Sequence, residues 1–467
     1  MAPVLIVACI LPLVAIALAL AALRLRVSRA RRGSHRTLGF LHPYCNDGGG
    51  GERVLWVALR DLVSRQAADG WRIVVYTGDR ATDDEIRAHA ASRFGVHVPP
   101  TVEFVRLSLR GWIEAKRYPV ATLIFQAVGS AVLAAEAVWR APPEVLVDTT
   151  GLAFCFPLLR VAGVRRLGAY VHYPIISSDM LAAVSSRRAA HNNAGRLAGS
   201  AVGTALKLVY YHLLTAAYRL AGRCAHVVVA NGSWTAGHLT RLWGGAPAVV
   251  FPPCDTRALE ALPLLPQGGR QALVLSLAQF RPEKDHALQL RAFALLLAQW
   301  KAIAEPKPKR PRLVVAGAVR HAADQAVLDS LRELASSLRL TDDDVSFAPN
   351  LSLPDVHSLL SKASVGLHTM WNEHFGIGVV EMMAAGLAVV AHDSGGPAMD
   401  IIGHGRETGL LASTPREYAD ALDELLLRPE SAATRATMAT MARESVKSRF
   451  SEVAFSDAFL AELARAL

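Results

Sequence analysis

The sequence predicts an α/β protein with two facing doubly wound Rossmann-like domains and a transmembrane helix at its N-terminus. Short apolar runs alternate with patterns typical of helices, and they fall into two series. Strands that are apolar throughout and followed by helices indicate parallel sheets covered on both faces. A stretch rich in proline and glycine separates the series, and a long uncharged run precedes the first. Because ligands bind beyond the carboxyl ends of such strands, we expect one cleft between the domains.

The N-terminal segment carries no charged residue from Val4 to Leu23. Twenty helical residues span about 30 Å, the thickness of the hydrocarbon core of a bilayer. We therefore expect residues 1–23 to form a membrane anchor. Residues 24–36 carry six arginines, which predicts a single-pass topology with the catalytic domains in the cytosol. A cleavable signal peptide is the alternative, but its basic region normally precedes the apolar core.

The domain boundaries follow from the two series. We expect a first domain at 37–255, a linker at 256–270, a second domain at 271–440 and a helical tail at 441–467. The strands predicted for the first domain are Thr37–Leu41, Arg72–Tyr76, Val145–Val147, Gly168–His172, Val227–Ala230 and Ala248–Phe251. Those predicted for the second domain are Ala272–Leu277, Leu313–Ala316, Val345–Phe347, Val365–Leu367 and Ala388–Ala391.

The segment from Ile175 to Cys224 fits neither series. Its second half predicts a helix at 205–218 with an apolar face. A helix that lies on the membrane surface is one interpretation, and ordinary packing against the core is the other.

Composition argues against a disulfide scaffold and against a nucleic-acid-binding protein. The five cysteines are scattered without metal-ligand spacing, which argues against a disulfide scaffold. The net charge of +10 could suit nucleic acid, but six of the arginines follow the apolar segment and no nucleic-acid-binding signature accompanies them. We therefore expect a membrane partner and no nucleic acid.

A glycine-rich motif, His42 to Arg53, follows the first predicted strand and precedes an amphipathic helix. Its four adjacent glycines are Gly48, Gly49, Gly50 and Gly51. Without a Cβ, their backbone amides can approach a ligand closely, and the N-terminus of the following helix favours an anion. We expect a loop that binds phosphate or the acceptor, although neither dinucleotide-binding nor Walker spacing is present.

Two further motifs follow strands of the second domain. Arg281 and Lys284 come directly after its first strand and could hold a diphosphate. Glu373 and Glu381 flank the start of a predicted helix near Phe375. The N-terminus of that helix can face a phosphate while Glu381 accepts hydrogen bonds from ribose hydroxyls and Glu373 reaches a sugar.

With these motifs, the chain resembles the retaining, two-domain glycosyltransferases of family 4, whose fold is called GT-B. The resemblance runs from about Leu38 to the C-terminus. The glycine-rich motif, Tyr170 to Pro174, Asn231 to Thr235 and Gln279 to His286 are most similar to the members that use GDP-mannose and extend dolichol-linked oligosaccharides in α-1,2 linkage.

The resemblance implies a role for each candidate residue. Glu381 would bind the donor ribose, Glu373 the transferred mannose and Lys284 the diphosphate. Many relatives carry arginine where this chain has Gln279, so Arg281 is the expected substitute. His172 corresponds to a histidine that meets the sugar near its reacting carbon. The donor side would also include the residues Phe375, Gly376, Ile377, Gly378 and the loop Gly395–Pro397.

The resemblance also implies the substrates and the location. We expect GDP-mannose as donor, a dolichol-diphosphate oligosaccharide as acceptor, and addition of its fourth and fifth mannoses at the cytosolic face of the endoplasmic reticulum membrane. Other mannosyltransferases of the pathway are candidate partners. We predict no cofactor and no metal, because no Asp-x-Asp stands in a suitable loop. The alternatives are a GT-B glycosyltransferase with another lipid acceptor and a non-catalytic partner subunit of that fold.

Overall fold

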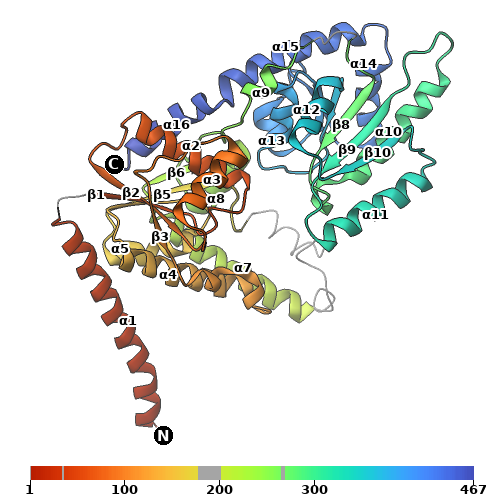
Figure 1. The fold of residues 1–467 in the computed structure, drawn as a ribbon. Helices are drawn as coiled ribbons and strands as arrows, with labels where there is room; N and C mark the ends of the chain where they lie inside the picture. Colours follow the sequence, from red (N-terminus) through yellow and green to blue (C-terminus); the bar gives the residue numbers. More distant parts are fainter. Residues whose placement is uncertain (1, 34–35, 177–200, 265–268) are drawn as a thin grey trace. The chain divides into compact units, whose positions relative to one another are not determined.

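The computed structural model describes residues 2–33, 36–176, 201–264 and 269–467. They form two compact units, which are shown in Figure 1. Unit 1 comprises Met1–Asn231, Thr235–Val250 and Ser456–Leu467, and unit 2 comprises Gly232–Trp234 and Phe251–Phe455. The stretch expected to be a linker therefore belongs to unit 2, where Arg257–Glu260 forms the short helix α9.

The C-terminal tail is divided between the units. Helix α15 (Ser431–Arg449) packs in unit 2, whereas the chain from Ser456 onward belongs to unit 1. The contacts explain this division: Ser456 donates a hydrogen bond to Asp61, and the ring of Phe459 lies 6.1 Å from that of Tyr170.

Unit 1 is built on a seven-stranded parallel sheet with the order β3-β2-β1-β4-β5-β6-β7. The strands are β1 (Arg36–Leu41), β2 (Trp71–Thr77), β3 (Glu103–Arg106), β4 (Val145–Asp148), β5 (Arg166–Val171), β6 (Val227–Ala230) and β7 (Ala248–Val249). The helices are α2 (Gly50–Ser64), α3 (Asp83–Phe94), α4 (Thr122–Arg140), α5 (Phe156–Ala162), α7 (Ala201–Gly222) and α8 (Ser233–Trp243). All six strands predicted for this domain are confirmed, and β3 is an additional edge strand.

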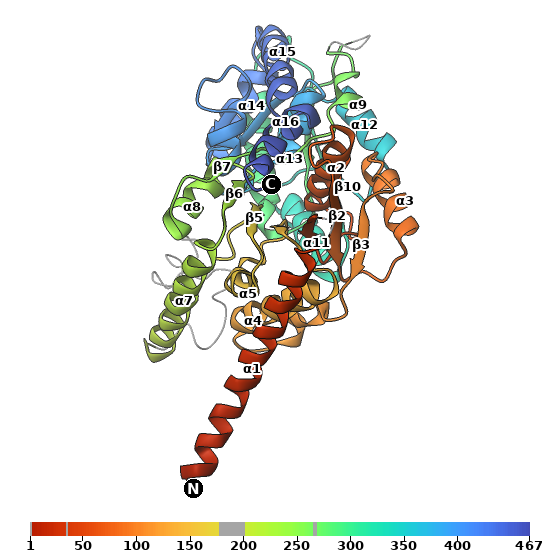
Figure 2. The ribbon, with the colours of Figure 1, turned by 90° about the vertical axis from the view of Figure 1, so that its left-hand side faces the viewer.

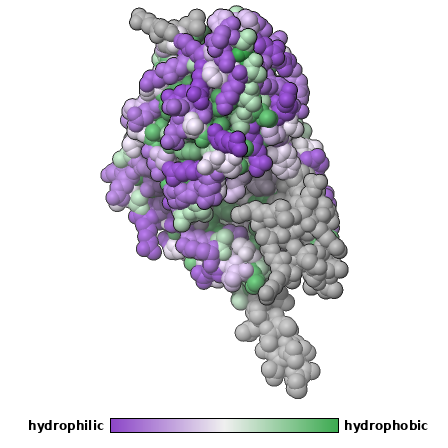
Figure 3. Space-filling view, turned by 90° about the vertical axis from the view of Figure 1, so that its right-hand side faces the viewer, coloured by the Kyte–Doolittle hydropathy of each residue, from purple (hydrophilic) through white to green (hydrophobic). Residues whose placement is uncertain are grey.

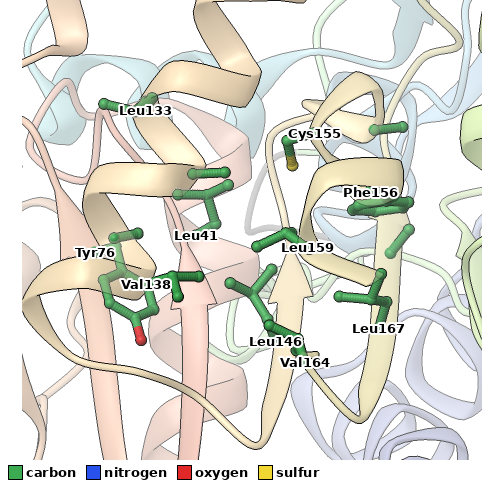
Figure 4. Packing of buried hydrophobic residues seen from close by; sticks show 14 of the residues in the cluster. Leu41, Tyr76, Leu133, Val138, Leu146, Cys155, Phe156, Leu159, Val164 and Leu167 are labelled. Atoms are coloured by element: carbon green, nitrogen blue, oxygen red, sulfur yellow. The ribbon is translucent and has the colours of Figure 1, made fainter. Parts of the chain in front are cut away.

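The core of unit 1 lies between this sheet and its covering helices. Figure 4 shows strand residues such as Leu41 and Leu146 against Leu133 of α4 and Leu159 of α5. These leucines are fully buried, and each contributes about 1.5–3 kcal/mol relative to an exposed side chain.

Unit 2 is built on a six-stranded parallel sheet with the order β10-β9-β8-β11-β12-β13. The strands are β8 (Leu273–Leu277), β9 (Arg312–Gly317), β10 (Val345–Pro349), β11 (Val365–Leu367), β12 (Ala388–His392) and β13 (Leu410–Ala412). The helices, besides α9 and α15, are α10 (His286–Ala302), α11 (Ala322–Ser337), α12 (Leu353–Lys362), α13 (Ile377–Ala384) and α14 (Pro415–Leu426). Two apolar clusters cover the two faces of the sheet, one with α10 and α14 and the other with α13 and α15. Five predicted strands are confirmed, and the fold is the predicted pair of doubly wound domains.

The N-terminal helix α1 extends from Ala2 to Ala30. The predicted anchor Val4–Leu23 falls within it, although the side chains up to Leu13 lie outside the described residues. Among the described residues, α4 is the helix that is long and apolar enough to cross a membrane, and 33% of it is buried. Because core helices meet the same criteria, this is weak evidence for a membrane span.

Helix α4 packs closely against the 3-10 helix Arg110–Ile113 at Gly129. A Cβ atom at position 129 would lie 2.0 Å from the carbonyl oxygen of Trp112. We therefore expect Gly129→Ala to lower the stability of the protein by about 1–3 kcal/mol through overpacking. Thermal unfolding of the purified full-length protein measures this effect.

Gly237, inside α8, provides the control, because a Cβ atom there would have no neighbour within 4 Å. Gly237→Ala should raise stability by roughly 0.5–1 kcal/mol, as expected for alanine in a helix. A Gly129→Ala variant that melts like the wild type would contradict the described packing of α4.

Candidate active site

Three loops of unit 2 meet at one edge of its sheet. They follow β8, β11 and β12, which are neighbours in the sheet order and run parallel. Because the carboxyl ends of parallel strands lie at the same edge, residues 278–285, 368–376 and 393–397 converge there.

An ion pair between Lys284 and Glu373 joins the first two of these loops. The Lys284 Nζ also lies 3.1 Å from the Sδ of Met370. The Nε2 of His368 lies 3.3 Å from Glu373 Oε2, the same oxygen that Lys284 contacts. Only 21% of the Lys284 side chain and 14% of the Glu373 side chain are exposed, so both charges are largely removed from water.

The carboxyl group of Glu373 is ionised. Burial alone would raise its pKa, but the hydrogen bond from His368 and the charge of Lys284 outweigh burial and hold its pKa well below the ordinary value. The pair therefore offers a cation and an oxygen acceptor side by side at neutral pH.

Hydrogen bonds to backbone carbonyls fix the two loops. The hydroxyl of Thr369 lies 2.8 Å from the carbonyl oxygen of Lys284 and 3.0 Å from that of Asp285, and it accepts a 2.9 Å hydrogen bond from Gln289. The phenol of Tyr418 donates a 2.8 Å hydrogen bond to the carbonyl of His368. The ion pair is therefore held in place before any ligand binds.

Helix α13 begins beside this pair. Its N-cap is Gly376, which has a φ of 113°, a conformation that favours glycine. A Cβ atom at Gly378 would lie 3.1 Å from the carbonyl oxygen of Leu277, the last residue of β8, so glycine allows the helix to approach the strand. Glu381 is the fifth residue of the helix and is half-buried.

The loop after β12 supports the segment that carries Glu373. The amide of Gly396 donates a 2.7 Å hydrogen bond to the carbonyl of Glu373. A Cβ atom at Gly395 would lie 2.3 Å from that same carbonyl oxygen, which explains the glycine. At the other end of α13, Arg270 and Arg443 donate to the carbonyls of Ala385 and Ala384, where cations stabilise a helix.

The side chains of Phe375 and Arg281, two residues predicted to bind the donor, have partners other than the Lys284–Glu373 pair. The ring of Phe375 is buried and stacks 5.7 Å from that of Phe251, so its side chain packs in the core of unit 2. Arg281 pairs with Glu283 at 3.9 Å, and 41% of its side chain is exposed. Of the two predicted cations, Lys284 contacts Glu373 and Arg281 contacts Glu283.

The glycine-rich loop of unit 1 is organised by Glu52. The backbone amides of Asp47, Gly48 and Gly49 donate hydrogen bonds to its carboxylate, and the bond from Gly48 is 2.7 Å long. Glu52 is only 4% exposed, and burial raises its pKa. The predicted anion-binding amides of Gly48 and Gly49 thus already have an acidic partner inside the protein.

His172 faces this loop. A Cβ atom at Gly51 would lie 3.4 Å from its Nε2, and this nitrogen is buried without a hydrogen-bond partner in the described structure. Behind it, the Nδ1 of His42 lies 2.7 Å from the hydroxyl of Thr149. Burial lowers the pKa of His172 to about 4. Burial, and secondarily the repulsion that would arise if both rings were protonated, lower the pKa of His42 to about 3. Both rings are therefore neutral near pH 7.

Sequence reasoning missed His368, Met370 and the internal role of Glu52. His368 directly follows β11, and the loop of Lys284 follows the neighbouring strand β8. The sequence therefore indicated that His368 and Met370 could lie near Lys284. Within the described ranges, no cluster of three or more His, Cys, Asp or Glu side chains could hold a metal ion. The metal-independent mechanism remains a prediction.

Two family models match the chain. The model described as ALG11 mannosyltransferase N-terminus matches residues 35–243, and the model described as Glycosyl transferases group 1 matches residues 265–444. Curated proteins of Dictyostelium discoideum, Mus musculus and Homo sapiens, each named GDP-Man:Man(3)GlcNAc(2)-PP-Dol alpha-1,2-mannosyltransferase, are 42%, 42% and 41% identical to it. The alignments cover 94% of this chain and 86%, 89% and 88% of those proteins.

Solved structures share the fold at low sequence identity. A glycosyltransferase from Rickettsia africae superposes with a TM-score of 0.61 at 14% identity, covering 93% of this chain and 98% of its own. A sucrose-phosphate synthase from Thermosynechococcus elongatus gives 0.62 at 17% identity, covering 92% and 98%. These likenesses confirm the predicted two-domain fold.

The lowered pKa of His172 predicts that the stability of the protein depends on pH. Its folded-state pKa of about 4 is below the ordinary value of 6.5, so between these values the unfolded chain binds more protons than the folded one. The free energy of unfolding should therefore fall as the pH decreases from about 6.5 towards about 4. Denaturant unfolding of the wild type and of His172→Gln over this range should show a smaller fall in the variant. Identical pH dependence would contradict a buried, neutral His172.

The hydroxyl of Thr369 should be essential for the geometry of the ion pair. Thr369→Val keeps the shape but removes the acceptor of Gln289 and the donor to one of the two carbonyls, so we expect a loss of about 1–3 kcal/mol in stability. Thr440, whose hydroxyl donates to Ala436 on an exposed part of α15, provides the control. Thr440→Val should change the melting temperature little, and equal effects of both variants would contradict the role given to Thr369.

Proposed function

The chain belongs to the ALG11 family of mannosyltransferases, and from this membership we propose that it transfers mannose from GDP-mannose to a Man(3)GlcNAc(2) dolichol-diphosphate in α-1,2 linkage. The observation that carries the proposal is the Lys284–Glu373 pair beside the start of α13, in a chain 42% identical to enzymes named for this reaction. The acceptor would receive its fourth mannose and then its fifth.

Lys284 is suited to the leaving group. Negative charge grows on the β-phosphate as the bond to the sugar breaks, and a preorganised cation stabilises that charge. An ammonium group has three hydrogen-bond donors, of which Glu373 and Met370 engage two. The third can bind the diphosphate without breaking the ion pair. The N-terminus of α13 adds a partial positive charge on the same side.

Glu373 and Glu381 are suited to the two sugars of the donor. The ionised carboxylate of Glu373 accepts hydrogen bonds from mannose hydroxyls while Lys284 and His368 fix its orientation. Glu381, farther along α13, accepts hydrogen bonds from the ribose. The α linkage of both donor and product means that configuration is retained, and we propose front-face attack by the acceptor hydroxyl.

His172 is suited to hydrogen bonding rather than to ion pairing. Its ring is neutral, and its Nε2 has no protein partner in the described structure. We assign it to a hydrogen bond with a sugar hydroxyl near the reacting carbon. Neutral His172 adds no charge that would bind the diphosphate in place of Lys284.

The membrane location rests on α1 and its arginines. We propose that α1 anchors the enzyme in the endoplasmic reticulum membrane, with both units on the cytosolic side, where the six arginines of residues 24–36 would be retained. A dolichol-linked acceptor lies in the same membrane. The names of the relatives support this substrate and favour it over another lipid acceptor or a non-catalytic role.

Two substitutions test the site. Lys284→Ala should lower kcat by about 10²-fold or more, as expected for loss of a preorganised group that stabilises developing charge. Glu381→Ala should mainly weaken donor binding, measured as a higher KM for GDP-mannose. The assay uses purified full-length protein, radiolabelled GDP-mannose and a dolichol-linked acceptor carrying three mannoses.

The exposed Lys301 near the end of α10 serves as the control, and Lys301→Ala should retain wild-type transfer. Full activity of both site variants would overturn the assignment of the site. A wild-type protein without transfer to this acceptor would overturn the proposed function itself.

A further inference from the structure

Helix α4 exposes an apolar face without charges. Ile124, Phe125 and Val128 are 38%, 46% and 53% exposed, and Val120, two residues before the helix, is 72% exposed. The sequence contains no charged residue from Thr122 to Ala135. A helix that faces water normally carries polar residues on that side, and a contiguous exposed apolar patch marks a surface for a partner.

Helix α14, also at the surface, is built differently. Its exposed side carries Arg416, Asp420 and Glu424, and Arg416 and Asp420 form an ion pair. Figure 3 shows a face of the molecule on which hydrophilic residues predominate and apolar residues are scattered. The uncharged face of α4 is therefore a local feature and does not reflect composition alone.

Helix α7 has a second apolar face. One side packs in the core of unit 1 through Leu214 and Tyr218. The side chains of Val209, Leu213 and Leu220 are 56%, 65% and 61% exposed on the helix. The helix predicted at 205–218 thus packs against the core and also presents apolar side chains outward, which is typical of a helix at a membrane surface.

Helix α1 is fixed to unit 1 beside these helices. Leu23 and Val27 are 6% and 1% exposed in the same core, and Arg26 donates a hydrogen bond to the carbonyl of Trp139 in α4. Figures 1 and 2 show that α1 projects from the side of unit 1 that carries α4, α5 and α7. If α1 is inserted in a bilayer, this side of unit 1 faces that bilayer.

The charges carried by the helices on this side are mainly basic. The sequences of α1 and α7 contain no acidic residue, and the single carboxylate of α4, Glu136, is engaged by Ser108 and Arg140. Lys116 and Arg117 precede α4 and are exposed, and Lys116 forms an ion pair with Glu114 at 2.8 Å. Basic residues beside apolar ones match anionic headgroups above acyl chains.

We propose that the face of unit 1 formed by α4 and α7 lies in the interfacial layer of the bilayer that holds α1. The apolar side chains of both helices enter the acyl-chain region, and Arg117 contacts lipid phosphates. A pocket of about 600 Å³ between the two helices, lined by Leu123, Tyr210 and Tyr211 among others, gives lipid chains room between them. The inference rests on the proposed membrane insertion of α1 and is independent of sugar transfer.

The test measures the depth of spin labels in the full-length protein. Nitroxides are attached at Phe125→Cys or Leu213→Cys in a Cys9→Ser, Cys224→Ser background, and the protein is placed in nanodiscs of phosphatidylcholine and phosphatidylserine with one copy each. Leu295→Cys on α10, where the native side chain is 38% exposed, is the control. Labels at 125 and 213 should collide several-fold more with oxygen than with a water-soluble nickel chelate, and the label at 295 should show the reverse.

Two results would overturn the proposal. Labels at 125 and 213 that resemble the label at 295 would place both helices in water. Labels shielded from oxygen and nickel alike would show that protein covers them, and with one copy in each disc that protein would be the chain itself.

A second measurement links the surface to the reaction. Ile124→Asp and Val128→Asp together should lower mannosyl transfer to the dolichol-linked acceptor in vesicles several-fold, with unchanged binding of GDP-mannose, whereas Leu295→Asp should change neither. Deep labels in a protein without transfer would leave the docking surface standing and remove the proposed function. Labels in water in a protein with full transfer would overturn the docking surface and leave the proposed function standing.

Discussion

The ion pair between Lys284 and Glu373 is the interaction on which the candidate site depends. Two charges that are largely shielded from water are tolerated only when they are paired and hydrogen-bonded, and removal of one leaves the other without compensation. The surrounding structure meets this requirement: Thr369 ties the lysine loop to the glutamate loop, and the glycines at 395 and 396 bring a third loop against the carbonyl of Glu373. The charge arrangement that would stabilise a departing diphosphate is therefore part of the folded protein.

The candidate residues of the two units differ in their chemistry. Unit 2 presents charged groups at the carboxyl edge of its sheet, and unit 1 presents neutral ones, since burial lowers the pKa values of His42 and His172. Charged groups suit the nucleotide diphosphate, whereas neutral hydrogen-bonding groups suit sugar hydroxyls. The carboxylate of Glu52 fits this division, because it occupies amides of the glycine-rich loop that would otherwise attract an anion to unit 1.

The sequence was sufficient for the strands that are apolar throughout, and it missed two of the four edge strands, β3 and β13. β3 carries charged residues at both ends and is only half-buried, and β13 is three residues long, so neither produces a strong apolar run. Lys284 and Glu373 could be found because each stands in a distinctive motif after a strand. The burial of Phe375 could not be predicted, because it depends on which segments meet in space. The amides of the glycine-rich loop were predicted to await a ligand, and only the fold reveals that Glu52 reaches back to them.

The seating of α1 has a consequence for the orientation of unit 1. Because Leu23 and Val27 are buried in the core of unit 1, the helix is fixed to that unit and is not joined to it by a free linker. Under the proposed insertion of α1 in a bilayer, unit 1 would therefore tilt together with the helix.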